Sequence, residues 1–256
     1  MDNTSLTYII TGGCSGLGLA TVTHLLSKSM KVAAFDLNIN NPAIESLKAQ
    51  YSGSFQLLVL KVDVTKQDEL TTAFNKVCDT LGPISGIVNC AGVLSAGLIK
   101  HRKPKYTMNE TTFSRTLKIN VIGTFLMCQT YVNLSIQKGY KKGVIVNISS
   151  VAAQEGQQGQ VAYSASKGAI MSMTMPMARE LGKKGIRVVC VMPGLFNTSM
   201  AHAMPPKVEK AIFKNSALGR YGKPEEFADF IESMLKNDYL TGVNLRLDGG
   251  TRLPML

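Results

Sequence analysis

The chain has 256 residues, 45% of them hydrophobic, and its 28 Lys and Arg outweigh 17 Asp and Glu to give a formal net charge of +11. This length and apolar content suffice for one large α/β domain with its own core. No run approaches the roughly 20 uninterrupted apolar residues of a membrane span, and the first residues lack the basic and apolar parts of a signal peptide, so we expect neither a membrane protein nor a secreted one.

Strands and helices alternate along the whole sequence. The apolar runs predict strands at 8–11, 31–36, 55–62, 84–89, 143–148, 186–191 and 243–247. The amphipathic segments predict helices at 17–29, 42–51, 67–81, 110–137, 163–183 and 224–236. Because each strand is a near-continuous run of Val, Ile and Leu, we expect a parallel sheet covered on both faces, in a single α/β domain over 1–256.

The first strand ends in a glycine-rich turn, Gly12-x-x-x-Gly16-x-Gly18, that opens the first helix. Such a turn presents backbone N–H groups and the positive end of the helix dipole to a pyrophosphate. The pattern alone is weak evidence, but a place between strand and helix is the context that the motif requires. We therefore predict a dinucleotide contact through Gly12 and the run Ser15-Gly16-Leu17-Gly18.

The second strand ends in Asp36. A carboxylate at this place accepts hydrogen bonds from the adenosine ribose hydroxyls and repels a 2′-phosphate. Ser15 and Leu37 stand where an enzyme that uses NADP would carry Arg or Lys. The sequence therefore predicts NAD.

Two further strand ends carry candidate cofactor residues. Asp63 and Val64 follow the third strand, and Cys90-Ala91-Gly92 follows the fourth. Because ligands of open parallel sheets bind at the carboxyl edge, we assign the first pair to the adenine and the second run to the cofactor cleft, although ordinary strand-end turns have similar composition. Cys14 and Cys90 have no nearby His and are expected to be thiols near the site, not nucleophiles.

A serine pair, Ser149-Ser150, closes the fifth strand, and the next helix begins with Tyr163 and Lys167. Residues four apart lie on one face of a helix, so the Lys167 ammonium can stand beside the phenol and lower its pKa from about 10. A phenolate near neutral pH is a usable base. A Tyr-x-x-x-Lys pair is common by chance, and its position behind a glycine-rich turn is what favours an oxidoreductase that uses a nicotinamide cofactor.

These residues resemble the short-chain dehydrogenase/reductase family over nearly the whole chain. The matching motifs are the T-G-x-x-x-G-x-G turn at Thr11 to Gly18, N-x-A-G at Asn89 to Gly92, and the tetrad Asn120, Ser150, Tyr163 and Lys167. The resemblance implies a doubly wound Rossmann domain with seven parallel strands, and usually a homotetramer. The segments 149–163, 193–198 and 246–252 resemble members that interconvert 3-hydroxyacyl-CoA and 3-oxoacyl-CoA with NAD, in fatty acid metabolism.

The resemblance also implies roles for single residues. Tyr163 would act as general base, Ser150 would bind the reacting oxygen, and Lys167 would stabilise the phenolate and hold the nicotinamide ribose. Asn120 would hold a water that relays the proton to solvent, although a helix Asn that only satisfies backbone groups is the commoner case. Pro193, Phe196 and Thr198 resemble residues that contact the nicotinamide, in a substrate loop at 193–223.

Two features concern the substrate. Gln157 resembles a residue that orients substrate, but a polar loop without ligand contact explains it almost as well. Between Lys100 and Lys105, five of six residues can be cationic. This run can receive the phosphates of coenzyme A, or it can be a solvated loop.

The sequence is also compatible with other functions. A 3-oxoacyl-carrier-protein or acetoacetyl-CoA reductase of the same family generally uses NADPH, which Asp36 disfavours, and a hydroxysteroid dehydrogenase shares the same motifs. A protein bound near RNA belongs to a different class and would agree with the +11 charge. The five unpaired cysteines and three histidines indicate a reducing compartment and no metal. We expect a cytoplasmic enzyme, with the mitochondrial matrix as the alternative, that acts on an acyl-CoA and not on nucleic acid or membranes.

Overall fold

Seven parallel strands form one sheet through the centre of the protein, in the order β3-β2-β1-β4-β5-β6-β7. The computed structural model describes residues 3–51, 54, 56–202 and 206–253. The strands are β1 (Thr7–Thr11), β2 (Lys31–Asp36), β3 (Leu57–Lys61), β4 (Ile84–Asn89), β5 (Gly143–Ile148), β6 (Ile186–Pro193) and β7 (Val243–Leu247). The predicted doubly wound, seven-stranded Rossmann fold is confirmed.

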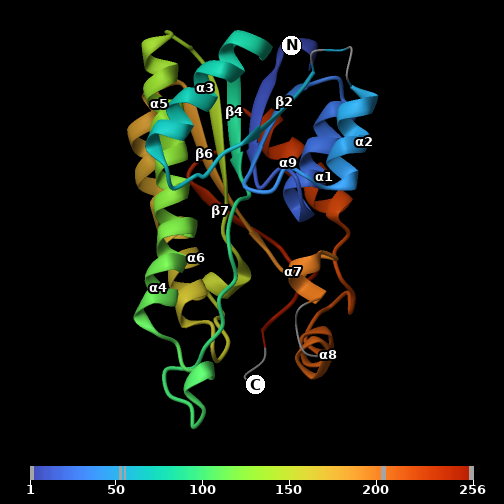
Figure 1. Ribbon diagram of the computed structural model, residues 1–256, viewed down its shortest axis with the longest axis vertical. Coiled ribbons are helices and arrows are strands. Elements are labelled where there is room, and N and C mark those ends of the chain that lie inside the picture. Colours follow the sequence, from blue (N-terminus) through green and yellow to red (C-terminus); the bar gives the residue numbers. More distant parts are fainter. Residues whose placement is uncertain (1–2, 52–53, 55, 203–205, 254–256) are drawn as a thin grey trace.

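Helices cover both faces of this sheet, as Figure 1 shows. The main ones are α1 (Gly16–Ser27), α2 (Pro42–Gln50), α3 (Gln67–Leu81), α4 (Glu110–Leu117), α5 (Thr124–Gln137), α6 (Val161–Leu181) and α9 (Pro224–Lys236). Short helices α7 (Ser199–His202) and α8 (Pro206–Lys214) and several 3₁₀ turns complete the chain. Helices α1, α2 and α9 contribute to one apolar core, and α3, α5 and α6 to the other.

The two cores follow from the period of the strands. Successive side chains of a strand point to opposite faces of its sheet. In β1, Ile10 therefore enters the core beneath α1 and α9, whereas Ile9 enters the core beneath α3 and α5. Val32 and Phe35 of β2 divide between the two cores in the same way. A strand buried on both sides needs apolar residues at every position, which explains the continuous Val and Ile runs.

The predicted element boundaries hold to within a few residues, with one interruption. The helix predicted at 110–137 is broken by a π-helical turn, Lys118–Gly123, between α4 and α5. Widened turns of this kind often mark functional sites, and this one contains Asn120. Helices α7 and α8 within 193–223 were not predicted, and positions 203–205 of that loop and position 55 of the predicted third strand lie outside the described residues.

The continuous helical stretch Glu110–Gln137 is long and apolar enough to cross a membrane by length and composition, with a mean hydropathy of 1.2 over its most apolar window. Half of that window is buried inside the fold. Here α5 packs on α3 and β4, and core helices of water-soluble proteins have the same length and composition. The hydropathy of this stretch is therefore weak evidence for a membrane span.

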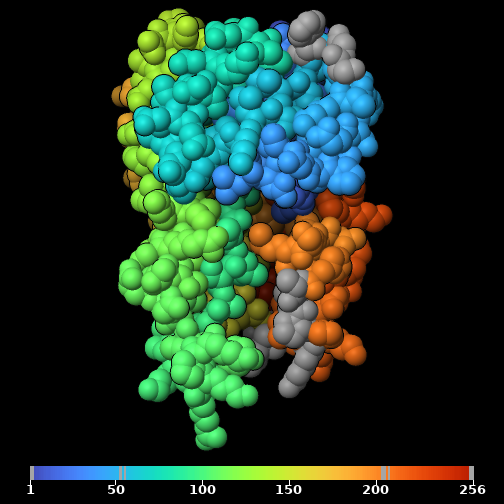
Figure 2. All heavy atoms as spheres, in the orientation of Figure 1, coloured from blue at the N-terminus to red at the C-terminus, as the bar shows by residue number. Residues whose placement is uncertain are grey.

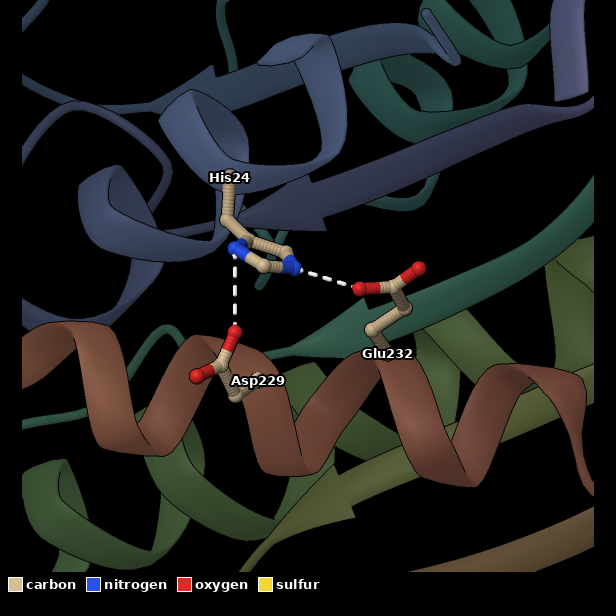
Figure 3. A group of neighbouring side chains, drawn as sticks. All are labelled: His24, Asp229 and Glu232. Carbon is tan, nitrogen blue, oxygen red and sulfur yellow. Dashed lines mark hydrogen bonds and ion pairs between the residues drawn. The ribbon is translucent and has the colours of Figure 1, made fainter. Parts of the chain in front are cut away.

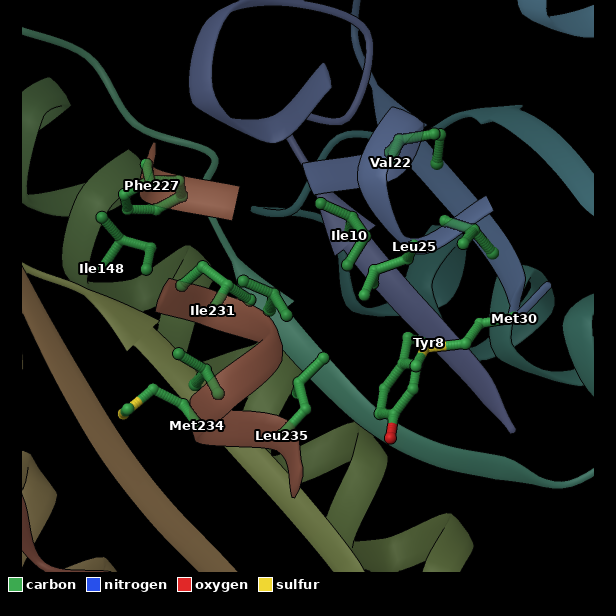
Figure 4. Close-up of a cluster of buried hydrophobic side chains, with 14 of the residues drawn as sticks. Tyr8, Ile10, Val22, Leu25, Met30, Ile148, Phe227, Ile231, Met234 and Leu235 are labelled. Carbon is green, nitrogen blue, oxygen red and sulfur yellow. The ribbon is translucent and has the colours of Figure 1, made fainter. Parts of the chain in front are cut away.

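Helices α1 and α9 lie side by side, and their facing side chains build the core cluster in Figure 4. Phe227 and Ile231 of α9 are fully buried there, with Leu25 of α1. Phe227 also packs edge to face on Phe196, with ring centroids 5.7 Å apart. The same core thus supports the segment after β6, to which the sequence assigns a cofactor contact.

We predict that Phe227→Ala lowers the free energy of unfolding by about 3–5 kcal/mol, because truncation of a buried aromatic residue leaves a cavity. Urea denaturation followed by circular dichroism measures this change. Tyr239→Ala is the matched aromatic control, since this side chain is 99% exposed and its loss should change the free energy by no more than about 0.5 kcal/mol. Equal losses in the two variants would contradict the assignment of Phe227 to the core.

Candidate active site

A cavity of about 660 Å³ lies where the carboxyl ends of the strands meet. Its mouth opens between the green segments near α4 and the orange segments of α7 and α8 in Figure 2. The structure brings all predicted cofactor and substrate residues to this wall. They are Gly12, Ser15, Gly16, Leu17, Gly18, Asp36, Asp63, Val64, Cys90, Ala91, Gly92, Ser150, Gln157, Tyr163, Lys167, Pro193, Phe196 and Thr198. Asn120 lies behind the wall and is fully buried.

The glycine positions of the turn disfavour side chains, through either backbone conformation or space. Gly12 and Gly16 adopt positive φ angles of 63° and 50°, which cost side-chain residues strain. A Cβ on Gly18 would stand 2.1 Å from the carbonyl oxygen of Gly12. Helix α1 begins at Gly16 with no acidic residue in its first turn, and the side chain of Ser15 forms no cap. Backbone N–H groups at the start of α1 therefore face a cavity that fits a pyrophosphate.

The Asp36 carboxylate stands beside this turn. Its Oδ2 accepts a hydrogen bond from the backbone N–H of Cys14 at 3.1 Å, and its Oδ1 accepts one from Asn38 at 3.1 Å. Asn41 caps α2 through Ile44 and also binds the carbonyl of Cys14. Each carboxylate oxygen keeps further acceptor capacity. The residues at this end of the cavity thus fit the ribose of a dinucleotide.

Asp63 and the two candidate thiols differ in ionisation. Burial opposes ionisation of Asp63, but hydrogen bonds from the N–H and hydroxyl of Thr65 at 2.9 and 2.8 Å outweigh it and lower the pKa of Asp63. Burial raises the pKa of Cys14 to about 11 and that of Cys90 to about 12. Both thiols therefore stay protonated near neutral pH, as expected for residues that are not nucleophiles.

Ser150 and Tyr163 meet in the cavity through a hydrogen bond. Ser150 also accepts a hydrogen bond from Ala152 N–H at 3.1 Å and so caps the 3₁₀ turn that follows β5. Burial raises the pKa of Tyr163, and the Ser150 hydrogen bond only partly opposes this effect. The lowered pKa that the Tyr163–Lys167 spacing predicts is therefore not found, because desolvation of the phenol dominates.

Lys167 is the buried cation of the site, with 5% of the residue exposed. Its Nζ donates to the carbonyl of Ile148 at 2.8 Å and lies 5.7 Å from the centroid of the Tyr163 ring. Ser149 fixes the backbone of the same residue by donating to the Lys167 carbonyl at 2.7 Å. Burial lowers the pKa of Lys167 to about 8, while the neighbouring Cys190 and Cys90 act in the opposite direction.

Asn120 is held by three hydrogen bonds of its side chain. Its Oδ1 accepts from Val93 N–H at 2.8 Å, and its Nδ2 donates to the Val93 carbonyl and to Ser166 Oγ, both at 2.9 Å. Ser166 in turn donates to the Tyr163 carbonyl at 2.7 Å. The side-chain amide thus joins the π-helical turn to α6 and has both of its N–H groups occupied. The backbone carbonyl of Asn120, which accepts from the Thr124 hydroxyl at 2.7 Å, is a further acceptor that can bind a water.

Several residues of the site were not predicted. Ser149, Ser166 and Val93 act through backbone and hydroxyl contacts that carry no separate sequence signal. The wall also includes Arg115, Lys118, Met200, Ile212 and Leu253. Arg115 and Lys118 are three positions apart on one helical stretch, so their shared face could have indicated that they belong to one wall.

The basic segment at 100–105 lies outside the cavity wall. It forms a loop closed by a parallel β-bridge, in which Leu98 N–H donates to the Tyr106 carbonyl at 2.9 Å and Met108 N–H donates to the Leu98 carbonyl at 2.7 Å, and it projects at the lower end of Figure 1. Gly97 N–H donates to the Gly159 carbonyl at 2.8 Å. The basic loop is therefore attached to the loop that carries Gln157, on the substrate side of the cavity.

One group of residues elsewhere has the composition of a metal site. His24 of α1 lies between Asp229 and Glu232 of α9, at 3.4 and 2.6 Å, as Figure 3 shows. The two carboxylates face different ring nitrogens, so the group is a polar link between the two helices. These three residues are not part of the cavity wall.

The fold and the site agree with a sequence comparison. Residues 7–209 match the family described as short chain dehydrogenase, and the chain therefore belongs to this family of oxidoreductases. Such enzymes typically use NAD or NADP and act on small-molecule substrates.

Among individual relatives, the chain is 36% identical to the 3-hydroxyacyl-CoA dehydrogenase type-2 of Bos taurus over 253 residues, 97% of this chain and 95% of the relative. It is 35% identical to the Drosophila melanogaster protein of the same name over 96% of each chain. Carbonyl reductase family member 4 of Xenopus laevis is 33% identical, over 94% of this chain and 96% of its own.

The burial of Lys167 predicts a dependence of stability on pH. Because its pKa falls from 10.5 to about 8 on folding, the unfolded chain holds more protons between these values, and this residue's contribution to the free energy of unfolding must rise with pH across that window. Urea denaturation of the wild type and Lys167→Met from pH 7 to 10 measures the difference. That difference should be constant below pH 8 and then rise. Parallel curves throughout would show that Lys167 carries no such shift.

Proposed function

We propose that the protein is an NAD-dependent dehydrogenase that interconverts 3-hydroxyacyl-CoA and 3-oxoacyl-CoA. The observation that carries the proposal is the convergence of Ser150, Tyr163 and Lys167 on one cavity that also contains the glycine-rich turn and Asp36. The names of the relatives at 35–36% identity support the substrate class.

NAD fits the residues at the cofactor end of the cavity. The amides at the start of α1 would bind the pyrophosphate, and Asp36 would accept the ribose hydroxyls. Asp63 and Val64 would border the adenine, while Cys90 to Gly92, Phe196 and Thr198 would border the nicotinamide half. Bound NAD supplies the hydride acceptor, and the protein supplies position and electrostatics.

Tyr163 and Ser150 would act on the substrate hydroxyl. Ser150 holds the oxygen, which positions its carbon, and Tyr163 removes the proton as general base. Burial favours the neutral phenol, so deprotonation needs positive charge nearby. Lys167 is the cation placed to provide it, and the oxidised nicotinamide ring is a second one.

The proton would leave through Lys167. A pKa of about 8 lets this residue exchange protons near the working pH. The backbone carbonyl of Asn120 can orient a water between Lys167 and solvent, because its side chain is bound to Val93 and Ser166. Asn120 thus also keeps α6, which carries Tyr163 and Lys167, in register with the turn after β4.

The substrate would enter from the side of α7 and α8. Gln157 lies on the wall beside Ser150, where it can orient the acyl group. The basic loop at 100–105, attached to the loop of Gln157 through Gly159, is placed to meet the phosphates of coenzyme A outside the cavity. Contacts so far from the reacting carbon would contribute mainly to binding.

Asp36 should dictate the choice of cofactor. We expect Asp36→Ala combined with Leu37→Arg to shift the ratio of kcat/KM for NADP over NAD upward by roughly 10²-fold, since a like-charge contact is replaced by an attractive one. Steady-state kinetics with both cofactors measures the ratio, and the two single variants separate the contributions. Efficient use of NADP by the wild type would refute the assignment of Asp36.

The function itself is tested by NADH production from 3-hydroxyacyl-CoAs of four to twelve carbons, with matched alcohols that lack coenzyme A. We expect oxidation of the CoA substrates, and a loss of kcat of about 10²–10⁴-fold in Tyr163→Phe with NAD affinity nearly unchanged. Tyr140→Phe is the matched control, because its hydroxyl lies by Cys78, 3.7 Å from the sulfur and away from the cavity. Turnover of a 3-oxoacyl substrate with NADPH alone would instead indicate a biosynthetic reductase.

A further inference from the structure

Arg246, at the end of edge strand β7, anchors several segments around the substrate end of the cavity. Its Nε and Nη2 lie 2.7 and 2.6 Å from Asp248 Oδ2, and Nη2 donates to the Thr251 carbonyl at 2.9 Å. Nη1 reaches across to the loop after β5, where it pairs with Glu155 at 2.7 Å and with Gln154 at 3.1 Å. One guanidinium thus joins the turn after β7 to the loop that begins at Ser150.

Glu155 extends this network to the end of the described chain. While its Oε1 binds Arg246, its Oε2 accepts a hydrogen bond from the backbone N–H of Leu253 at 2.9 Å. Arg252 adds a longer contact with Glu155 at 3.7 Å. Glu155 itself is fixed by its N–H, which donates to the Val151 carbonyl at 3.0 Å. The carboxylate is therefore shared between a neighbouring cation and the backbone that carries Leu253.

The same turn also holds the substrate loop. Gly194 N–H donates to the Leu247 carbonyl at 3.0 Å, Leu218 N–H donates to Gly249 at 3.1 Å, and Arg252 N–H donates to Asn215 at 2.9 Å. Residues 248–253 are thus bonded to the nicotinamide side of the cavity and to the chain after α8, as well as to the Ser150 loop. We call the set Arg246, Asp248, Glu155 and Leu253 the C-terminal clamp.

The charged side chains of the clamp are partly shielded from water. The side chains of Arg246, Glu155 and Asp248 are 22%, 24% and 9% exposed. Charge-assisted hydrogen bonds that are partly shielded from water are stronger and more directional than surface pairs. Burial opposes ionisation of Glu155, but the bonds from Arg246 and Leu253 outweigh it and keep its pKa low. The carboxylate therefore stays charged and bound at neutral pH.

Leu253 is the clamp residue that reaches the cavity. Its side chain lines the wall together with Met200 and Ile212, which come from the substrate loop. These three apolar residues share the cavity wall with Ser150 and Gln157. An apolar wall made of side chains from three different segments suits an acyl chain and limits its length.

We propose that Glu155 is a positioning residue that holds Leu253 as the wall of the acyl-chain pocket, and that Leu253 thereby determines chain-length specificity. The inference rests on the proposed acyl-CoA substrate. Glu155 acts on the reaction through Leu253 and through the loop of Ser150, without touching the reacting atoms. Loss of its charge should release Leu253 and enlarge the pocket.

The test compares kcat/KM for eight-carbon and four-carbon 3-hydroxyacyl-CoA in four variants. Leu253→Ala should raise the ratio of the eight-carbon to the four-carbon value by about 10-fold, the scale of apolar discrimination in a pocket. Glu155→Gln should raise it in the same direction. The double variant should match Leu253→Ala within about 2-fold, because the two residues act on one wall and their effects are not additive.

Glu232→Gln is the matched control for a general loss of stability. Glu232 is 14% exposed and, like Glu155, holds two partners, with a hydrogen bond to His24 and an ion pair with Lys236. This control should lower the melting temperature to a similar degree and leave the chain-length ratio unchanged. If Glu232→Gln changes the ratio equally, or if the effects of Glu155→Gln and Leu253→Ala multiply, the clamp is refuted.

Hydrogen exchange tests the clamp independently of the substrate. In Glu155→Gln, amides of residues 150–157 and the Leu253 amide should lose protection together, by about 10-fold or more, whereas Glu232→Gln should leave both unchanged. Unchanged protection in Glu155→Gln would overturn the inference even if the enzyme is active on acyl-CoA. Turnover restricted to alcohols without coenzyme A would refute the proposed substrate but not the clamp. The chain-length ratio of kcat/KM can then be measured on eight-carbon and four-carbon secondary alcohols.

Discussion

The pairing of β1 with β2 on one side and β4 on the other determines where this protein can bind a ligand. The chain leaves β1 toward β2 and α1, while β4 and the later strands lie on the opposite side. The turns after β1 and β4 therefore diverge and open a crevice at the carboxyl edge. Gly12 marks the floor of this crevice, where a Cβ would stand 3.1 Å from the backbone nitrogen of Ala91. The absence of a side chain at Gly12 allows this close approach, and the candidate cofactor and catalytic residues are arranged along the crevice that the two turns define.

The site places polar side chains inside an apolar core, and hydrogen bonds offset the free-energy cost of burying them. Asn120, Ser166 and Lys167 are all buried, and burial of polar groups is unfavourable unless they are hydrogen-bonded. Here the Asn120 amide is satisfied by Val93 and Ser166, and the Lys167 ammonium is bound by a backbone carbonyl. The π-helical turn at Lys118–Gly123 is the local distortion that allows the helix to present Asn120 to Val93. The candidate catalytic side chains and the backbone groups around them are thus held by hydrogen bonds that satisfy both.

Much of this arrangement could be read from the sequence because it depends on local patterns. The apolar runs predicted the strands. Glycines and polar residues at strand ends predicted the cavity wall, and Asp63 and Cys90 do lie on that wall. What the sequence could not reveal depends on contacts between distant segments. The π-helical turn needs Val93 as partner to Asn120, the phenol of Tyr163 is desolvated by a fold that surrounds it, and Glu155 meets Leu253 across 98 positions. The charge density of the segment at 100–105 suggested that it could bind phosphates. A run of charges does not reveal whether a loop lines a cavity or lies outside it, as this one does.

The half-buried thiol of Cys90 acquires a further meaning from the proposed substrate. An acyl-CoA is a thioester, and thiolates attack thioesters by acyl transfer. Cys90 lines the cavity, but with its pKa raised to about 12 only about one molecule in 10⁵ carries the thiolate at pH 7. Desolvation thus makes Cys90 a poor nucleophile, and a poor nucleophile would not attack the thioester bond between an acyl group and coenzyme A. The proposed acyl-CoA substrate would therefore share a cavity with this cysteine without acylating it.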